Sequence, residues 1–389
     1  MIPAARLSAA IAILDRFLAG EAAEKALTNW ARGARYAGSG DRAAVRDVVF
    51  QAIRRLRSQA ALGGAMTGRG LVLGGLRADG VDPDTLFTGA GHAPAPLTAG
   101  ERAGGRQPEG AEALDCPDWL EGELRASLGE GFEPAMRALQ HRAPVHLRAN
   151  LLKADRAAVA ARLAGEGIET RPHPLSPTAL EVTEGARRLQ ASATLAEGWA
   201  ELQDAASQAV TDTLPLSAGM KVLDYCAGGG GKTLALAGRA GGLGLRFYAH
   251  DANPARMRDL PARAARAGAQ VTILDDPVAA GPYDLVLCDV PCSGSGAWRR
   301  APEGKWRLDR AGLDRLLATQ AEILDLAAGL VRENGVLAYA TCSLLRCEDQ
   351  EQAEQFSLRN PGWEVRMILD IHTLQEGDGF FIAHLTRAM

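Results

Sequence analysis

The sequence predicts an α/β protein in which a doubly wound, mostly parallel sheet follows an all-helical first part. Three observations lead to this prediction. Strand-like and helix-like segments alternate after residue 200, amphipathic stripes run through the first eighty residues, and a glycine-rich turn follows the first strand of the alternating region. The chain has 389 residues, which is enough for two or three domains.

The N-terminal region carries two apolar stripes with helical spacing. The first consists of Leu7, Ile11, Leu14 and Leu18, and the second of Val45, Val48, Val49, Ala52, Ile53 and Leu56. Asp41 precedes the second stripe, so we expect its carboxylate to cap that helix. Residues 1–57 carry ten basic and five acidic side chains. This excess fits a phosphate-facing surface and fits a solvated helix face equally well.

Composition divides the remainder of the chain. A stretch rich in Gly, Pro and Ala indicates a linker, and it precedes a helix around Trp119 to Leu128 and a strand at Val145–Asn150. The predicted parts are therefore a helical domain at 1–85, a linker at 86–112, a small α+β segment at 113–200 and the α/β domain at 201–389.

The α/β domain is predicted from five strands and three helices. The strands are expected at Met220–Asp224, Leu245–Asp251, Val271–Leu274, Leu285–Cys288 and Val336–Ala340, and the helices at Thr233–Ala240, Pro254–Ala267 and Asp309–Leu330. The segments 363–368 and 379–385 predict a hairpin, which adds an antiparallel terminal strand to the sheet.

Composition also excludes several classes of protein. The sequence contains no run of eighteen apolar residues, so no membrane span is expected. Asp15 and Arg16 interrupt the apolar N-terminus, so no secretory signal is expected. The six cysteines show neither paired metal-ligand spacing nor a dense disulfide pattern. We therefore expect a cytoplasmic protein with reduced thiols, no metal site and no membrane partner. The net charge of −4 gives no overall signal for nucleic acid.

The turn from Asp224 to Thr233 is open to three interpretations. A P-loop is the first, because Gly231, Lys232 and Thr233 match its second half, but Cys226 stands where its first glycine is needed. A dinucleotide loop is the second, and its glycine spacing is not reproduced. A site for a nucleoside sulfonium is the third. It is favoured because Asp251, Asp275 and Asp289 follow successive strands, where carboxylates bind ribose, adenine and the methyl donor.

Two cysteines follow strands of the same predicted sheet. Cys292 comes after Asp289-Val-Pro, and Cys342 lies in Thr-Cys-Ser. Methylation of a pyrimidine at carbon 5 requires a thiolate that adds to carbon 6, an acid near the ring nitrogen and a group that aids elimination. Cys342, Asp289 and Cys292 supply these groups. Inert core cysteines are the usual alternative, and this interpretation suits Cys288 and Cys226 better.

These motifs together resemble the RsmB/NOP2/Sun-like family of RNA 5-methylcytosine methyltransferases. The resemblance rests on Asp289–Gly296, Ala340–Ser343 and Cys226–Thr233, and it continues in Trp298–Trp306, Gln203–Ser207 and Gly377–Ile382. The N-terminal helices, with Tyr36–Arg42, resemble the NusB-like RNA-binding domain found in such enzymes. The resemblance covers nearly the whole chain and implies a Rossmann-like class I methyltransferase domain.

The resemblance also implies roles for the site residues. Cys342 would be the nucleophile, Cys292 would assist product release, Asp289 would contact the cytosine and Lys232 would lie near the same pocket. S-adenosylmethionine, converted to S-adenosylhomocysteine, would be bound at its ribose by Asp251 and at its adenine by Asp275, with Asp276 as the alternative. The rest of the cofactor site would be Cys226, Ala227, Gly228, Gly229, Gly230, Gly231, Lys232 and Asp289.

The implied reaction is methylation of carbon 5 of a cytosine in RNA, most directly 16S ribosomal RNA in a single-stranded or opened region, by a monomeric enzyme. A non-catalytic RNA-binding or ribosome assembly factor and a transfer RNA methyltransferase are the alternatives. Two positions depart from the family pattern. Gly229 replaces a proline, which is expected to loosen the loop and weaken cofactor binding, and Val290 replaces an alanine.

Overall fold

The computed structural model describes residues 1–372, 374 and 377–388, which form two compact units. The helical unit comprises residues 1–125, 129–142 and 298–307, and the sheet unit comprises 126–128, 143–297 and 308–389. The four-part division predicted from the sequence stays a prediction. Within the described part of the chain, no helix is long and apolar enough to cross a membrane.

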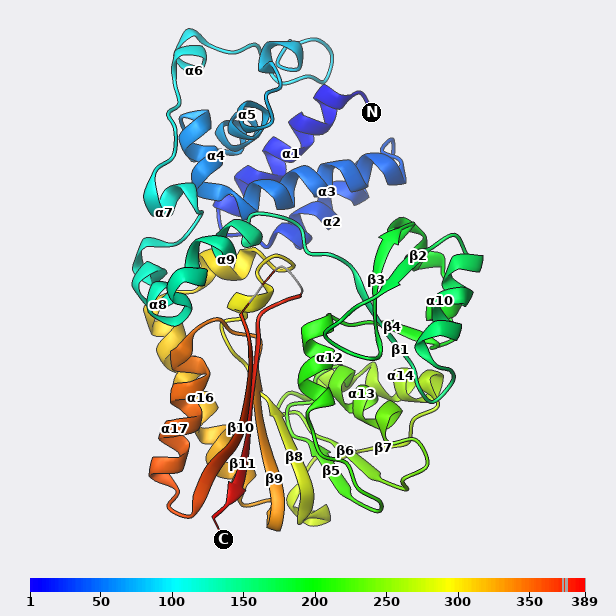
Figure 1. The fold of residues 1–389 in the computed structure, drawn as a ribbon. Helices are drawn as coiled ribbons and strands as arrows, with labels where there is room; N and C mark the ends of the chain where they lie inside the picture. The colour runs from blue at the N-terminus through cyan, green and yellow to red at the C-terminus, as the bar shows by residue number, and fades with distance from the viewer. Residues whose placement is uncertain (373, 375–376, 389) are drawn as a thin grey trace. The chain divides into compact units, whose positions relative to one another are not determined.

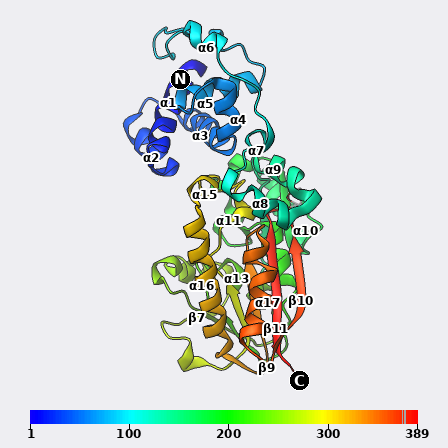
Figure 2. The same cartoon turned by 90° about the vertical axis from the view of Figure 1, so that its left-hand side faces the viewer.

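The helical unit is built on five main helices around one apolar core (Figures 1 and 2). The main helices are α1 (Pro3–Leu18), α2 (Ala23–Gly33), α3 (Ser39–Arg54), α4 (Leu56–Gly63) and α5 (Gly68–Ala78), and further helices follow at α6 (Ala99–Ala103), α7 (Gly110–Ala113), α8 (Asp118–Leu128) and α9 (Phe132–Leu139). The two predicted stripes are confirmed, because Leu14, Val45 and Ile53 are buried in this core. Phe87 and Leu97, from the Gly/Pro/Ala-rich stretch, are buried in it too.

Asp41 caps α3 from a different place than the sequence predicts. The helix begins at Ser39, so Asp41 lies inside its first turn rather than before it. From there its carboxylate accepts a hydrogen bond from the backbone N–H of Gly38 at 3.2 Å, as the acid of a capping box does. It also pairs with the N-terminal ammonium of Met1 at 3.0 Å and with Arg6.

Several basic side chains of this region form ion pairs within the helical unit, and the pair with Asp118, which lies outside residues 1–57, reduces the basic excess. Arg16 pairs with Glu21, Arg46 with Glu24, and Arg57 with Asp118. The proposal of a phosphate-facing surface therefore stays a prediction.

A short segment from late in the chain belongs to the helical unit. It contains α15 (Glu303–Arg307), and Lys305 is buried there, with Nζ 3.1 Å from the carbonyl oxygen of Arg54. Trp306 donates its indole N–H to the carbonyl of Ile53 at 2.7 Å, and Arg54 donates to the carbonyl of Arg299 at 2.7 Å. Burial lowers the pKa of Lys305 to about 8, although Asp115 opposes this shift.

The sheet unit contains two sheets. The smaller one is antiparallel, with strand order β2-β3-β1-β4, and it confirms the strand predicted near residues 145–150. Its strands are β1 (His146–Ala149), β2 (Glu169–Pro172), β3 (Ala179–Glu184) and β4 (Ala200–Leu202). Helices α10 (Arg156–Gly165) and α11 (Ala193–Ala196) accompany it, and Val159 and Leu163 of α10 pack with Leu147 and Leu180.

The larger sheet has the order β10-β11-β9-β8-β5-β6-β7. Its strands are β5 (Lys221–Asp224), β6 (Arg246–Ala249), β7 (Val271–Ile273), β8 (Tyr283–Asp289), β9 (Val331–Thr341), β10 (Trp363–Ile371) and β11 (Phe380–Arg387). All neighbours pair in parallel except β11, which is antiparallel to both β9 and β10. The predicted doubly wound sheet with an antiparallel terminal strand is confirmed.

Helices cover both faces of this sheet. In Figure 1, α16 (Arg310–Ala328) and α17 (Gln350–Arg359) lie on one face, and α12 (Ala205–Asp212), α13 (Gly231–Arg239) and α14 (Leu260–Ala267) lie on the other. Figure 2 shows α16 and α17 side by side. A separate apolar core fills each side, with Phe356 and Tyr339 in one and Leu236 and Leu285 in the other.

One predicted helix is divided in two. The sequence predicts a helix over Pro254–Ala267, whereas the structure has a 3-10 turn at Pro254–Met257 followed by α14. Pro261 is the second residue of α14, where its missing N–H is not needed. Inside a longer helix the same proline would remove a hydrogen bond and clash with the preceding turn.

We predict that the buried ammonium of Lys305 makes stability depend on pH. Its pKa is lower in the folded chain than in the unfolded one, so the unfolded chain binds more protons between about pH 8 and the ordinary lysine value. The free energy of unfolding of the wild type, minus that of Lys305→Met, should rise by roughly 1 kcal/mol between about pH 7 and pH 9. Denaturant titrations of the wild type and of Lys305→Met at both pH values measure this difference in the free energy of unfolding.

The matched control is Lys25→Met, which removes an exposed lysine of the same unit. Its difference from the wild type should not change with pH. An equal pH dependence in both variants would contradict the assignment.

Candidate active site

The carboxyl ends of β8 and β9 bring the two predicted cysteines together. These strands are parallel neighbours in which Asp289 is paired with Ala340, and the N–H of Val290 donates to the carbonyl of Ala340 at 3.0 Å. Cys292 and Cys342 follow these positions at nearly the same distance along each strand. Their sulfurs lie 3.5 Å apart, and neither forms a disulfide. The structure thus confirms that the two thiols share one site.

The two thiols are not equivalent. A hydrogen bond to the sulfur of Cys342, together with burial, raises the pKa of Cys292 well above the ordinary value for a thiol. This shift favours the protonated form of Cys292, and either sulfur can be the donor in the contact between the two thiols. Burial likewise raises the pKa of Cys226 and of Cys288, as expected for cysteines that do not react.

Glu348 holds the loops that carry both thiols, and the sequence analysis missed it. This fully buried carboxylate accepts hydrogen bonds from the backbone N–H and hydroxyl of Ser293 at 2.8 and 2.5 Å, and from the hydroxyl of Ser343 at 2.6 Å. Each serine directly follows one of the cysteines. Gln320 donates to the same carboxylate at 3.0 Å and to the carbonyl of Pro291 at 3.0 Å. One acid therefore fixes both loops.

Lys232 and Asp289 form an ion pair next to the thiols. The Nζ of Lys232 lies 2.8 Å from Oδ2 of Asp289, and it also lies over the ring of Phe380, 4.9 Å from the centroid. Burial opposes the charge on Lys232, but Asp289 outweighs burial and raises the pKa of the ammonium. Cys342 also favours this charge electrostatically, so the ammonium is placed to stabilise a thiolate there.

Left-handed backbone angles and contacts within the chain define the shape of the glycine loop. Gly228 and Gly230 have φ angles of +49° and +79°, in the left-handed region. A Cβ on Gly230 would lie 2.2 Å from a methyl carbon of Leu260, so only glycine fits there. The N–H of Gly228 donates to Oδ2 of Asp251 at 3.0 Å, which joins the loop to the end of β6. The backbone N–H of Ala227 donates to the carbonyl of His250.

Arg263 holds the loop at Gly229, where the family proline is absent. Its guanidinium donates to the carbonyl oxygen of Gly229 and pairs with the buried carboxylate of Glu201 at 3.1 Å. This contact supplies a restraint that the sequence does not reveal. The expected loss of cofactor affinity stays a prediction.

The predicted cofactor carboxylates lie on neighbouring strands. Asp251 is buried after β6, where the N–H of Asn253 and the guanidinium of Arg256 also contact it. The chain after β7 continues beside β6, because the N–H of Leu274 donates to the carbonyl of Ala249, and the exposed Asp275 follows directly. Asp276, the alternative, accepts from Val278 within its own turn, which leaves Asp275 the better candidate.

Asp224 is a second residue that the sequence analysis did not identify as part of the site. It ends β5, is buried and accepts a hydrogen bond from the hydroxyl of Thr233 at 2.6 Å. Burial raises the pKa of its carboxyl to about 7. Its place at a strand end, directly before the glycine loop, is the signal that could have identified it.

Comparison with known proteins places this geometry in a family. The profile of the 16S rRNA methyltransferases RsmB/F matches residues 212–386, and that of the RsmF/B-like ferredoxin-like domain matches residues 116–187. Ribosomal RNA small subunit methyltransferase B of Xanthomonas campestris pv. campestris is 31% identical over 302 residues, which cover 72% of this chain and 68% of that protein. The probable ribosomal RNA small subunit methyltransferase B of Synechocystis sp. is 32% identical, covering 71% and 68%.

The chain spans about two thirds of the length of the curated relatives it matches. The relative from Klebsiella pneumoniae, for example, is 31% identical over 70% of this chain and 66% of its own length.

Solved structures share the fold. The structure called "Crystal Structure of PH0851" aligns with a TM-score of 0.75 at 22% identity, covering 100% of this chain and 99% of that one. "The crystal structure of NSun6 from Pyrococcus horikoshii with SFG" aligns with a TM-score of 0.61 at 17% identity, covering 70% and 98%. By its sequence, and in agreement with this fold, the chain belongs to the family of the 16S rRNA methyltransferases RsmB/F.

Proposed function

We propose that the chain transfers the methyl group of S-adenosylmethionine to carbon 5 of a cytosine in small-subunit ribosomal RNA, through a covalent adduct with Cys342. The observation that supports this most is the 3.5 Å contact between the sulfurs of Cys292 and Cys342, beside the pair formed by Lys232 and Asp289. The substrate follows from the family and from the relatives named above. We further propose that the chain acts as a monomer.

Cys342 is assigned as the nucleophile. Its sulfur forms a bond to carbon 6 of the cytosine, and the electrons of the 5,6 double bond move to carbon 5, which becomes able to attack a methyl group. The ammonium of Lys232 stabilises the thiolate before attack. Asp289, whose side chain is one-third exposed at 33%, is assigned to the cytosine edge, where it stabilises the protonated ring nitrogen of the adduct.

The cofactor supplies an electrophilic methyl group, and the chain supplies its binding site. We assign Asp251 to the ribose, Asp275 to the adenine edge, and the loop from Cys226 to Lys232 to the remainder. The loop and Asp251 are already joined through Gly228, so binding requires little reordering of the backbone.

Cys292 is assigned to product release. After methylation, a water molecule accepts the proton of carbon 5, the electron pair of that C–H bond re-forms the 5,6 double bond, and the bond from carbon 6 to the sulfur of Cys342 breaks. The departing sulfur carries the electron pair. We assign the stabilisation of this leaving group to the protonated thiol of Cys292, whose sulfur lies 3.5 Å away.

The first prediction concerns Cys342→Ala. Without the nucleophile, transfer of labelled methyl groups to small-subunit ribosomal RNA should fall by more than about a thousandfold, while RNA affinity stays unchanged. Filter assays, with bisulfite sequencing of the product, measure this. Cys347→Ser is the matched control, because it alters a half-buried thiol five residues away. Wild-type methylation by Cys342→Ala would overturn the proposed mechanism.

The second prediction concerns Cys292→Ala. Methylation should still occur, but elimination should slow, so a covalent protein–RNA complex should accumulate on a denaturing gel. The double variant Cys292→Ala/Cys342→Ala should form no complex. A complex in the double variant would show that another residue makes the bond.

The third prediction concerns Glu348→Gln, which replaces an acceptor oxygen with an NH₂ group that cannot accept from Ser293 or Ser343. Both thiol loops should shift, and kcat should fall about 10- to 100-fold with little change in KM for RNA. Glu351→Gln, at an exposed acid nearby on the chain, should retain wild-type kcat. Equal effects of the two substitutions, or a change confined to KM, would speak against a positioning role.

A further inference from the structure

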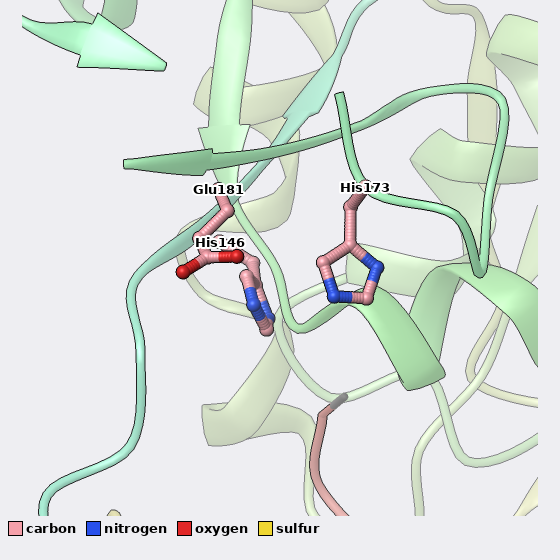
Figure 3. A group of neighbouring side chains, drawn as sticks. All are labelled: His146, His173 and Glu181. Atoms are coloured by element: carbon pink, nitrogen blue, oxygen red, sulfur yellow. The ribbon is translucent and has the colours of Figure 1, made fainter. Parts of the chain in front are cut away.

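A second group of side chains that could bind a ligand lies in the small sheet. The proposed reaction gives these side chains no role. His146 on β1 and Glu181 on β3 are directly opposed in the antiparallel register. His173 follows β2, and its backbone N–H donates to the carbonyl of Ala179 at the start of β3. Figure 3 shows the three side chains turned toward one another, and one ligand atom from each lies within 4.8 Å of the others.

The ring of His146 is held like that of a metal ligand. Its side chain is fully buried, Nδ1 lies 3.0 Å from Oδ2 of Asp204, and the backbone N–H of Ala205 points at Nδ1 from 3.2 Å, a contact that is lost as a hydrogen bond when Nδ1 carries a proton. The carboxylate is the nearer and the charged partner, so it favours a proton on Nδ1. Nε2 then carries the lone pair. A carboxylate behind a ligating imidazole is the usual outer shell of a metal site.

The Nε2 atom of His146 is buried without a hydrogen-bond partner among the described residues. A buried polar atom without a partner destabilises the folded state, so native structures rarely leave one unpaired without a reason. His146 forms a group of possible metal ligands with His173 and Glu181, and Nε2 is the ring nitrogen of His146 that has no other partner among the described residues. We propose that these three side chains bind a divalent transition-metal ion, with zinc as the best match.

The other two ligands fit this assignment. His173 is buried, and its Nδ1 accepts a weak hydrogen bond of 3.3 Å from the N–H of Leu175, which is lost if metal binding at Nε2 moves the proton to Nδ1. Glu181 is partly exposed, and Arg171 donates to one of its oxygens, Oε2, through both Nε and Nη2. Its other oxygen is the one assigned to the metal.

The donor set selects the class of ion. Two imidazoles and one carboxylate suit zinc, at about 2.0–2.2 Å per ligand, with a fourth position for water. Ligand atoms around such an ion are about 3.3 Å apart, so the side chains must close by about 1.5 Å from their largest separation.

The proposed metal site lies beside a surface hollow and next to Asp204, which holds several segments of the chain together. A surface hollow of about 400 Å³ is lined by His173 together with Arg156, Pro172, Pro174, Ser176 and Pro177. Asp204 also accepts from the N–H groups of Ala206 at 2.8 Å and Asp378 at 3.0 Å. A bound ion would therefore join β1, β3 and the start of α12 to the segment before β11.

The test uses the full chain in the Cys292→Ala/Cys342→Ala background, which removes the thiol pair as a competing zinc site. After treatment with a chelator, calorimetric titration with Zn²⁺ should show one equivalent bound, and Tm should rise with zinc. His146→Gln and Glu181→Gln should each weaken the Kd at least tenfold. His92→Gln, at an exposed histidine of the helical unit, should bind like the parent.

Glu181→Gln keeps the test decisive if His146→Gln fails to fold, because its side chain is partly exposed. Absence of stoichiometric zinc binding in the parent, or unchanged affinity in Glu181→Gln, would overturn the proposed site.

Discussion

The buried carboxylate of Glu348 is the interaction on which the candidate active site depends. Its hydrogen bonds with Ser293, Ser343 and Gln320 fix two loops that lie far apart in the sequence. A buried carboxylate is costly unless several donors satisfy it, so the loops cannot separate without exposing or orphaning it. The short distance between the thiols of Cys292 and Cys342 follows from this restraint.

In the proposed mechanism, the placement of charged groups gives the two thiols different roles. Lys232 lies on the first turn of α13, directly after the glycine loop. Its ammonium forms an ion pair with Asp289 and also interacts electrostatically with Cys342. Cys292 keeps its proton because of its hydrogen bond and burial. The same loop that positions Lys232 is joined to Asp251 through Gly228, so the proposed cofactor site and the nucleophile depend on one backbone conformation.

Much of this arrangement could be predicted from the sequence, because periodicity and strand ends are local signals. The parallel strands before Cys292 and Cys342 were sufficient to predict that the thiols meet. The role of Glu348 was not predictable, since an acid in a helical context gives no sign that it is buried behind two loops. The burial of Lys305 and the grouping of His146 with His173 and Glu181 could not be predicted for a related reason. Their partners come from distant elements with no regular spacing in the sequence.

The central claim is that Cys342, and not Cys292, forms the bond to the cytosine. Peptide mapping of a trapped complex tests this claim most directly. RNA carrying 5-fluorocytosine at the methylated position cannot lose a proton from carbon 5, so the wild-type enzyme should stop at the covalent adduct. After digestion, mass spectrometry should find the nucleotide on the peptide that contains Cys342. A nucleotide on the peptide that contains Cys292 would contradict the account.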